Sequence, residues 1–279
     1  MEFNSLEEKC RYYQGVSNYK LEKNSYVICH LDGRAFSKMV KNKFKKPFDD
    51  DFVSCMNRTA EYLCKNVQGV KMAYVQSDEI TLVMTDITAD GNGTMFFDGR
   101  LCKMQSILAS MATGIFNKQM LIYEAAKMES DGQAASTASL MSLLTDMKLY
   151  EFDCKCWNVP NANDALAWVL YRQIDCVRNS KQQAAQTWLS HRQLHGKTTD
   201  EQVSMLKEQK GIDWNDYPDD VKYGRFVMKR YETRTAVVNG KETVYQRSVW
   251  SALPAAELTD AVSRAKIMNI INVETSLHV

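Results

Sequence analysis

The sequence predicts an α+β fold, in which a ferredoxin-like core carries helices on one face and a helical and β-hairpin extension follows it. Segments with strand and helix patterning come in the order strand, helix, strand, strand, helix, strand, helix, which is the split βαβ order of a ferredoxin-like domain. The composition agrees, because 45% apolar and 25% charged residues are typical of a globular protein. A chain of 279 residues is long enough for one large or two small domains.

Local patterns place the elements of the N-terminal third. Charged residues at helical spacing predict a short helix within residues 1–24, and a β-branched and aromatic run predicts a buried strand at 25–31. An apolar stripe at helical period predicts a helix at 50–66 that begins at an Asp-rich turn. The runs VKMAYV and EITLVM flank only the four residues 76–79, so they predict a hairpin beside the first strand at the centre of the sheet.

Composition and periodicity place the remaining elements. Asn239-Gly240 lies between two strand-like runs and is a strong signal for a second hairpin. We divide the chain into a catalytic domain at 1–158 and a C-terminal region at 159–279 that completes the fold. Between the hairpins we expect a loop at 86–95, helical segments at 98–128, 163–194 and 199–209, a Ser-, Ala- and Gly-rich loop at 129–147, and a strand at 150–159.

Charge, cysteine usage and motif content exclude several classes of protein. With 35 basic and 34 acidic residues, the total charge indicates no nucleic-acid or membrane partner, so such a partner must be read from local clusters. Cys154 and Cys156 share one face of a strand and no CxxC pair occurs, which favours reduced thiols. No signal peptide and no apolar run of about 20 residues is present, so we expect a soluble cytoplasmic protein without a membrane partner. No GxSxG, HExxH or P-loop motif is present, so the sequence gives no support to a hydrolase or a P-loop enzyme.

Two carboxylates fall where neighbouring strands should meet. Asp32 follows the first strand, and Asp78 lies in the turn of the first hairpin. Like charges a few ångströms apart resist joint ionisation unless a cation lies between them. Mg²⁺ is the natural occupant because it prefers oxygen ligands and completes its shell with substrate phosphates. Two such ions about 4 Å apart would stabilise the attacking and leaving oxygens of a phosphoryl transfer.

A glycine and a group of lysines follow Asp32 directly. Gly33 lacks a side chain, so its carbonyl would be able to reach a metal and a triphosphate would be able to approach the backbone. The lysines at 38, 41, 43, 45 and 46 would supply the positive charge that phosphates require. Each fragment alone also fits an ordinary turn or solvated loop, and it is the joint placement on adjacent strands that favours a site.

Three segments carry a resemblance to a known family. HLDGRAFSKMVKNKFKKPFDD and VKMAYVQSDEITLVM resemble the two signature segments of the tRNA-His guanylyltransferase family, and FDCKCWNVPNANDALAWVLYRQIDC is similar to its following strand and helix. The resemblance covers about residues 5–230 and implies a core like a polymerase palm. It also implies that a nucleoside triphosphate activates the 5′ end of tRNA, and that the 3′ hydroxyl of an incoming nucleotide then attacks the activated phosphate, so that tRNA grows in the 3′ to 5′ direction.

The resemblance implies the site residues by position. Asp32, the backbone of Gly33 and Asp78 would hold two Mg²⁺ ions, and Lys46 and Ser77 would join the two aspartates as catalytic residues. Lys46 falls on a Lys-Pro-x-Asp motif and would steady phosphate during activation. The substrates ATP and GTP would contact Asp32, Gly33, Arg34, Ala35, Phe36, Ser37, Ser77 and Asp78.

The resemblance also implies partners. Arg100 and Lys103 match a helical Arg-x-x-Lys that handles tRNA phosphate, and their spacing places both side chains on one face of a helix. The region 159–279 would contact tRNA as well. Members of the family are commonly tetramers, so we expect a homo-oligomer, a tetramer, whose tRNA spans subunits.

The sequence departs from the family pattern at four places, and two other functions stay open. Val75 replaces a glycine, Ser37 replaces a histidine, and residues near 200–202, DEQ, replace an Asp-Lys-Asn-Glu segment. Residues 177–180, VRNS, replace a His-Ile-Asn-Asn segment associated with choosing tRNA-His. The last departure favours repair of 5′-truncated tRNAs over strict tRNA-His identity. A palm-type nucleotide cyclase is one alternative, although the Gly-Gly-Asp/Glu-Glu-Phe hairpin is absent. A catalytically idle tRNA-binding protein is the other, and retention of both carboxylates argues against it.

Overall fold

The computed structural model describes residues 3–132, 136–238 and 241–272. Its centre is one antiparallel six-stranded sheet in the order β4-β1-β3-β2-β5-β6. The first four positions reproduce the strand order of a ferredoxin-like domain, so the predicted neighbourhood of the first strand and the first hairpin is confirmed. The strands are β1 Tyr26–Gly33, β2 Val70–Gln76, β3 Glu79–Thr85, β4 Phe152–Val159, β5 Arg225–Val238 and β6 Lys241–Pro254.

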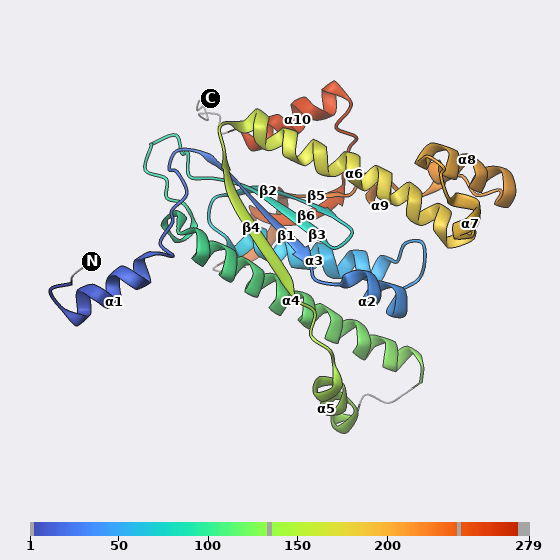
Figure 1. The fold of residues 1–279 in the computed structure, drawn as a ribbon, viewed down its shortest axis with the longest axis horizontal. Helices are drawn as coiled ribbons and strands as arrows, with labels where there is room; N and C mark the ends of the chain where they lie inside the picture. Colours follow the sequence, from blue (N-terminus) through green and yellow to red (C-terminus); the bar gives the residue numbers. More distant parts are fainter. Residues whose placement is uncertain (1–2, 133–135, 239–240, 273–279) are drawn as a thin grey trace.

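Helices cover both faces of the sheet (Figure 1). The two core helices, α3 Asp50–Asn66 and α4 Leu101–Ser130, pack their apolar stripes on one face, which is the arrangement that the sequence predicts for the core. Two helices of the C-terminal extension, α6 Ala162–Trp188 and α10 Ala261–Ile271, cover the other face. Alternate residues of β1 therefore face two separate apolar layers, as the strand period of two requires.

The remaining elements are short. The helix α1 has no buried residue and lies at one end of the molecule, away from the sheet (Figure 1). These elements are α1 Leu6–Gly15, α2 Phe36–Lys43, α5 Thr137–Asp146, α7 His191–Leu194, α8 Thr199–Lys210 and α9 Asp219–Lys222, with 3₁₀ turns at Phe96–Gly99 and Trp214–Asp216.

Three sequence expectations need correction. The stretch 129–147, expected as a loop, contains α5, whose first turn is capped by the Ser136 side chain. The helix expected at 163–194 is broken, because Leu189 is extended and Ser190 starts α7 through a capping box with Gln193. The first strand does not end at residue 31 but continues to Gly33, which keeps the next two residues paired in the sheet.

The C-terminal region shares the sheet of the N-terminal region. The strand β5 pairs with β2, and Phe226 packs in the same apolar layer as Tyr74. The strands of the second hairpin pair up to Val238 and Lys241, while the turn expected at Asn239-Gly240 lies outside the described residues. The division at residue 158 remains a prediction, although the sheet and its core run across it.

Two further expectations concern covalent and membrane chemistry. All eight cysteines are free thiols, as the sequence predicts, and the Sγ atoms of Cys154 and Cys156 lie 3.6 Å apart on one face of β4. Within the described ranges, no helix combines the length and the apolar character that a membrane span requires.

Candidate active site

The two predicted carboxylates meet at one end of the sheet. Asp32 is the penultimate residue of β1, and Ser77 and Asp78 form the two-residue turn between β2 and β3. The Gly33 N–H donates to the Asp78 carbonyl at 3.1 Å, which ties the end of β1 to that turn. Asp32 pairs in register with Glu79 on one side and with Asp153 of β4 on the other. Four carboxylates therefore gather where β1, β3 and β4 end or begin.

The charges of this cluster are not balanced locally. Burial first, and then the charges of Asp32 and Glu79, raise the pKa of Asp78 to about 6, although hydrogen bonds from Ser77 and the backbone oppose them. Burial, Glu79 and Asp153 also raise the pKa of Asp32. Among the described residues, no lysine, arginine or histidine forms an ion pair with Asp32 or Asp78. A ligand that supplies positive charge would lower the pKa of both aspartates and stabilise their ionised forms.

Glu79 differs, because a neighbouring helix neutralises it. Arg172 of α6 donates two hydrogen bonds of 2.7 Å from Nη2 to the two carboxylate oxygens and one of 3.0 Å from Nε. The same guanidinium bonds Asp175 at 2.9 Å. Burial lowers the pKa of His30, which lies 3.9 Å from Glu79, to about 4, so His30 is neutral near pH 7. Among the described residues, Asp32, Asp78 and Asp153 are thus the carboxylates of the cluster without an ion pair, and burial raises the pKa of Asp32 and Asp78.

This donor set fits Mg²⁺ better than a softer metal. Asp32, Asp78 and the Gly33 carbonyl offer only oxygen atoms, and Mg²⁺ takes one or two carboxylates and leaves the rest of its shell to water and phosphate. In the described part of the chain, no group of three or more His, Cys, Asp or Glu side chains forms a complete protein cage for a metal. An incomplete, oxygen-only set is what a metal shared with substrate phosphates requires.

The backbone after Gly33 is shaped to approach an anion. Ala35 adopts a left-handed conformation with φ of 58° and precedes α2, whose first turn has no side-chain cap. Free N–H groups at a helix start favour phosphate oxygens. The Phe36 side chain is buried in the core beside Phe116 and Phe152, so only its backbone is available to a nucleotide. A Cβ on Gly33 would lie 2.6 Å from the Phe36 ring, which excludes larger residues without a shift.

The lysine-rich segment after α2 lies beside this turn. Lys46 is exposed and forms no ion pair within the described ranges, whereas Lys43 pairs with Glu124 of α4. Asp49, from the same Lys-Pro-x-Asp motif, accepts hydrogen bonds from the N–H groups of Asp51 at 2.9 Å and Phe52 at 3.2 Å. Asp49 therefore serves as the N-cap of α3 and orients the loop that carries Lys46.

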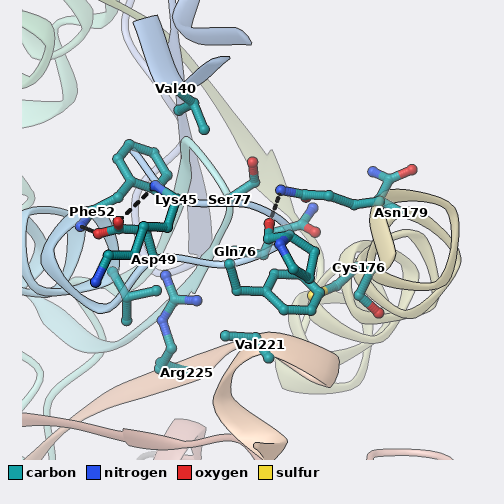
Figure 2. Close-up of a pocket in the computed structure, with 15 residues that line it drawn as sticks. Val40, Lys45, Asp49, Phe52, Gln76, Ser77, Cys176, Asn179, Val221 and Arg225 are labelled. Atoms are coloured by element: carbon teal, nitrogen blue, oxygen red, sulfur yellow. Dashed lines mark hydrogen bonds between the residues drawn. The ribbon is translucent and has the colours of Figure 1, made fainter. Parts of the chain in front are cut away.

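A pocket opens next to Ser77, between the 45–53 segment and α6 (Figure 2). Its cavity volume is about 80 Å³. Figure 2 shows Lys45 and Asp49 on one side, Cys176 and Asn179 on the other, and Arg225 below. The wall is mostly apolar with a few polar groups; its residues are Val40, Lys45, Pro47, Phe48, Asp49, Phe52, Val53, Gln76, Ser77, Cys176, Asn179, Ser180, Gln183, Val221 and Arg225.

A second hollow flanks the opposite side of α2. It is lined by Arg34, Lys38 and Lys43 from the α2 segment and by Lys148 and Glu151 from the segment before β4. Arg34 pairs with Glu151 at 2.6 Å, so the hollow keeps an excess of positive charge. The hollow begins at Arg34, the residue after Gly33. Phosphates bound at the carboxylate cluster would therefore lie next to its basic side chains.

The structure places Arg100 and Lys103 far from this cluster. Both are exposed at the start of α4, where the backbone of Arg100 forms an isolated antiparallel β-bridge with that of Lys20, in the segment that leads into β1. Phe152, the register partner of Gly33 at the carboxylate end of the sheet, lies beside a later part of α4, because its N–H donates to the Thr113 hydroxyl at 3.0 Å. Arg100 and Lys103 precede Thr113 by thirteen and ten residues, or about 20 and 15 Å of helix, so these two cations belong to a separate surface.

Sequence reasoning missed three contributors to the site. Arg172 entered only as part of a family resemblance, and Asn179 and Ser180 only as a departure from a family pattern. The signal for Arg172 was its place at a buried position of an amphipathic helix, because a buried arginine needs a carboxylate partner. That the partner is Glu79, 93 residues earlier, follows only from the packing of α6 on the sheet.

Comparison with known proteins agrees with this geometry. The family model described as tRNAHis guanylyltransferase matches residues 7–160. The tRNA(His) guanylyltransferase of Neurospora crassa is 25% identical over 254 residues, which span 87% of this chain and 80% of that protein. An uncharacterized protein of Acanthamoeba polyphaga mimivirus is 25% identical over 232 residues, spanning 80% of this chain and 76% of its own length.

Solved structures give the same result. A bacterial tRNA(His) guanylyltransferase-like protein in complex with ATP is similar with a TM-score of 0.78 at 26% identity, covering 97% of this chain and 100% of that one. The complex with GTP gives a TM-score of 0.71 at 25% identity, covering 96% and 99%. The tRNA(His) guanylyltransferase of Saccharomyces cerevisiae, at 19% identity and a TM-score of 0.59, covers 84% and 94% and supports the fold alone.

Proposed function

This chain belongs to the tRNA(His) guanylyltransferase family of nucleotidyltransferases, and from that premise we propose that it adds nucleotides in the 3′ to 5′ direction to the 5′ end of tRNA, after ATP or GTP has activated the 5′ phosphate. The observation that carries the proposal is the pair of unpaired carboxylates, Asp32 and Asp78, beside an uncapped helix start. Carboxylates suit metal ions and the free N–H groups suit phosphate, so the two features together suit a nucleoside triphosphate.

Asp32, Asp78 and the Gly33 carbonyl would hold two Mg²⁺ ions, which when bound stabilise negative charge on the attacking and leaving oxygens. The backbone from Gly33 to Ser37 would bind and orient the triphosphate, with Arg34 and Ser77 at its borders. Lys46 is positioned to add positive charge during activation, because it is exposed on the loop that Asp49 fixes.

The pocket beside Ser77 would take the base of a bound nucleotide. Its apolar wall suits a planar ring, and Asn179 and Arg225 supply donors for the edge of a base. Arg225 is buried and donates to Asn57 at 3.0 Å and to the Asp220 carbonyl at 3.1 Å, so its orientation is fixed before any ligand binds. The basic hollow on the other side of α2 would receive phosphates.

The single most informative test is nucleotide addition by an Asp78→Asn variant. A 5′-labelled tRNA lacking its first nucleotide, with ATP, GTP and Mg²⁺, should be extended by the parent protein. Asp78→Asn should lower the rate by three orders of magnitude or more while the fold is kept. Glu129→Gln, on the exposed end of α4, is the matched control and should keep the parent rate. An active Asp78→Asn variant would refute the assignment of the metal site.

The same assay separates the two alternatives. A nucleotide cyclase would convert ATP or GTP to a cyclic product without tRNA. An idle tRNA-binding protein would bind tRNA and leave it unchanged. The latter is disfavoured, because a buried aspartate with a raised pKa lowers stability and a protein without catalysis has no need to keep it.

Substrate choice follows from the segment 177–180. Asn179 and Ser180 line the pocket beside the catalytic turn, so this departure from the family pattern lies where a substrate would be recognised. We therefore expect 5′-truncated tRNAs to be preferred over full-length tRNA-His by at least tenfold in kcat/KM. Parallel assays of the two tRNAs test this, and strict preference for full-length tRNA-His would refute it.

Assembly and location are also part of the proposal. The exposed apolar side chains Leu6 and Tyr13 of α1 and Val16, which follows it, support a homo-oligomer, a tetramer, in which another copy covers them. Light scattering coupled to size exclusion measures the mass directly, and a monomer would refute the proposal. Eight free thiols suit a reducing compartment and support a cytoplasmic location.

A further inference from the structure

Three aromatic residues form a row along the junction of β4 and α6. Trp157 of β4 packs edge-on against Trp168 of α6, with ring centroids 4.7 Å apart. Trp168 in turn contacts Tyr171, one helical turn further on, at 5.5 Å. Trp157 and Trp168 are partly buried against the apolar layer beneath α6. The two tryptophans therefore support the third ring, Tyr171, from below and fix its position.

The row ends beside the carboxylate cluster. The Trp168 ring contacts His30, with centroids 5.8 Å apart, and His30 precedes Asp32 by two residues on the same face of β1. The Arg172 guanidinium lies 5.4 Å from the centroid of the Tyr171 ring while it bonds Glu79, the register partner of Asp32. One short chain of contacts thus connects the aromatic ring to the carboxylate site.

Tyr171 is open to solvent although it stands on this buried support. Its side chain is 56% exposed, as is that of Ile174 beside it on the helix. Within the described ranges the Tyr171 hydroxyl forms no hydrogen bond, so the ring is not held there as a polar anchor. In that same part of the chain, the buried Trp168 Nε1 also has no acceptor. The Tyr171 ring, supported by Trp168 and open to solvent beside the proposed phosphoryl-transfer site, is therefore accessible to a planar ligand.

This face is distinct from the pocket beside Ser77. At 100° per residue, Tyr171 and Ile174 lie on one flank of α6, whereas the pocket residues Cys176, Ser180 and Gln183 lie on the other. Arg172 and Asp175 lie between the two flanks; Arg172 holds α6 to Glu79, and Asp175 pairs with Arg172 and with Arg178 within the helix. The helix therefore offers a separate recognition surface on each side of the carboxylate cluster.

We propose that Tyr171 is a stacking surface for a nucleobase next to the reacting phosphates. The inference rests on the proposed function, which brings both an RNA end and free nucleotides to this site. The face of an aromatic ring binds any base by stacking, with a contribution of about 1–3 kcal/mol per base on substitution by alanine. The base is either that of the terminal RNA nucleotide or that of a free nucleoside triphosphate, and the two sources are separable by experiment.

The test compares Tyr171→Ala with Tyr171→Phe, which keeps the ring. Tyr231→Ala is the matched control, because Tyr231 is a more exposed tyrosine on the outer part of β5. Binding of a 5′-truncated tRNA is measured by fluorescence anisotropy without nucleotide, and binding of ATP and GTP by calorimetry without RNA. Thermal denaturation checks that each variant is folded. We expect Tyr171→Ala to weaken one of these equilibria at least fivefold, while Tyr171→Phe and Tyr231→Ala stay within twofold.

Each result has one meaning. Weaker RNA binding alone identifies the base of the RNA end, and weaker nucleotide binding alone identifies the base of the triphosphate. If the folded Tyr171→Ala variant binds both as the parent does, or if Tyr231→Ala loses as much, the stacking surface is refuted. That failure is distinct from failure of the proposed function, in which the parent protein itself would not extend a 5′-truncated tRNA.

Discussion

The guanidinium group of Arg172 donates three hydrogen bonds to the carboxylate of Glu79, two of 2.7 Å from Nη2 to the two oxygens and one of 3.0 Å from Nε. Glu79 directly follows Asp78 and pairs with Asp32 across the sheet, so this contact fastens α6 to the Ser77-Asp78 turn. It also removes one negative charge from a cluster of carboxylates. The pair therefore has an electrostatic consequence for the site as well as a structural one.

Replacement of Arg172 by methionine should expose that consequence. Glu79 would be left without its cation, and breaking a buried pair costs about 3–5 kcal/mol of folding free energy. The unbalanced charge of Glu79 should raise the pKa of Asp78 above its value of about 6. The acidic limb of the pH profile of nucleotide addition should then move to higher pH, which rate measurements between pH 5.5 and 9 would detect.

A double variant separates charge from packing. Arg172→Met with Glu79→Gln removes both charges and leaves the acidic limb near its original position, even though the hydrogen bonds are gone. A limb that stays displaced in the double variant would show that Arg172 acts through the position of α6 alone. An unchanged limb in the single variant would contradict the electrostatic argument altogether.

The sequence carries much of this site, because the deciding contacts are local. Asp32 ends a strand, Asp78 occupies a two-residue turn, and the strand order of a split βαβ domain makes the two neighbours. The helix 50–66 is confirmed at both ends, since its apolar stripe and the Asp49 cap are encoded within one segment. Such features need no information about packing between distant segments.

The remaining features depend on packing or on weak local signals. The pairing of Arg172 with Glu79 and the placing of Asn179 in the pocket require the position of α6 on the sheet, which no local pattern fixes. The helix α5 was missed because its Ser- and Ala-rich composition resembles a loop, although Ser136 caps it. The break at Leu189 lacks glycine and proline, and only the Ser190 capping box marks it.

The raised pKa of Asp78 predicts how stability depends on pH. Because its pKa is about 6 in the folded protein and about 3.8 when unfolded, the folded state holds the proton more tightly. The contribution of Asp78 to stability should therefore be fully present below about pH 4 and should be lost as pH rises through about 6, a loss on the order of 1–3 kcal/mol. Asp78→Asn should lack this fall, so it should be more stable than the parent at pH 7.5 in the absence of divalent ions.

Thermal denaturation at pH 4.5 and 7.5, with EDTA or with Mg²⁺, measures the effect. Addition of Mg²⁺ should recover stability in the parent and not in Asp78→Asn, because metal bound to the native state alone stabilises it. Equal responses to Mg²⁺ in both proteins would count against Asp78 as a ligand. Equal pH dependence with EDTA would count against its raised pKa.

Arg100 and Lys103 lie on a different surface from Lys46, so replacing them should affect a different step of the reaction. Arg100 and Lys103 lie at the end of the sheet remote from Asp32, so their joint replacement by alanine should weaken tRNA binding about tenfold and leave the KM for ATP unchanged. The slope of log affinity against log salt should become shallower by about 0.9 for each phosphate that the variant no longer neutralises. Lys46→Ala should instead slow activation and leave tRNA affinity within twofold.

Lys266→Ala is the control for both, because that lysine is exposed on α10, on the opposite face of the sheet from α4. Filter binding at several salt concentrations and single-turnover activation assays supply the two readouts. The assignment would be wrong if Arg100 and Lys103 changed the KM for ATP while tRNA binding stayed the same.

Gly33 should tolerate no side chain, because its α-carbon faces the Phe36 ring. A Cβ there would lie 2.6 Å from the ring, so Gly33→Ala must displace Phe36 from its packing against Phe116 and Phe152. Overpacking of this kind costs about 1–3 kcal/mol. The shift would also move the backbone at the start of α2, so the KM for ATP should rise at least tenfold. Denaturant unfolding and steady-state kinetics measure the two effects.

Gly114→Ala provides the opposite case within the same protein. Gly114 lies inside α4 with nothing within 4 Å of the added carbon, so alanine there should stabilise the helix by about 0.5–1 kcal/mol and leave the kinetics unchanged. If Gly33→Ala behaved like Gly114→Ala, packing of Gly33 on the Phe36 ring would not fix the start of α2, and the backbone proposed to bind the triphosphate would lack that support. If Gly33→Ala were less stable but kept the parent KM, the packing of Gly33 on Phe36 would be structural only.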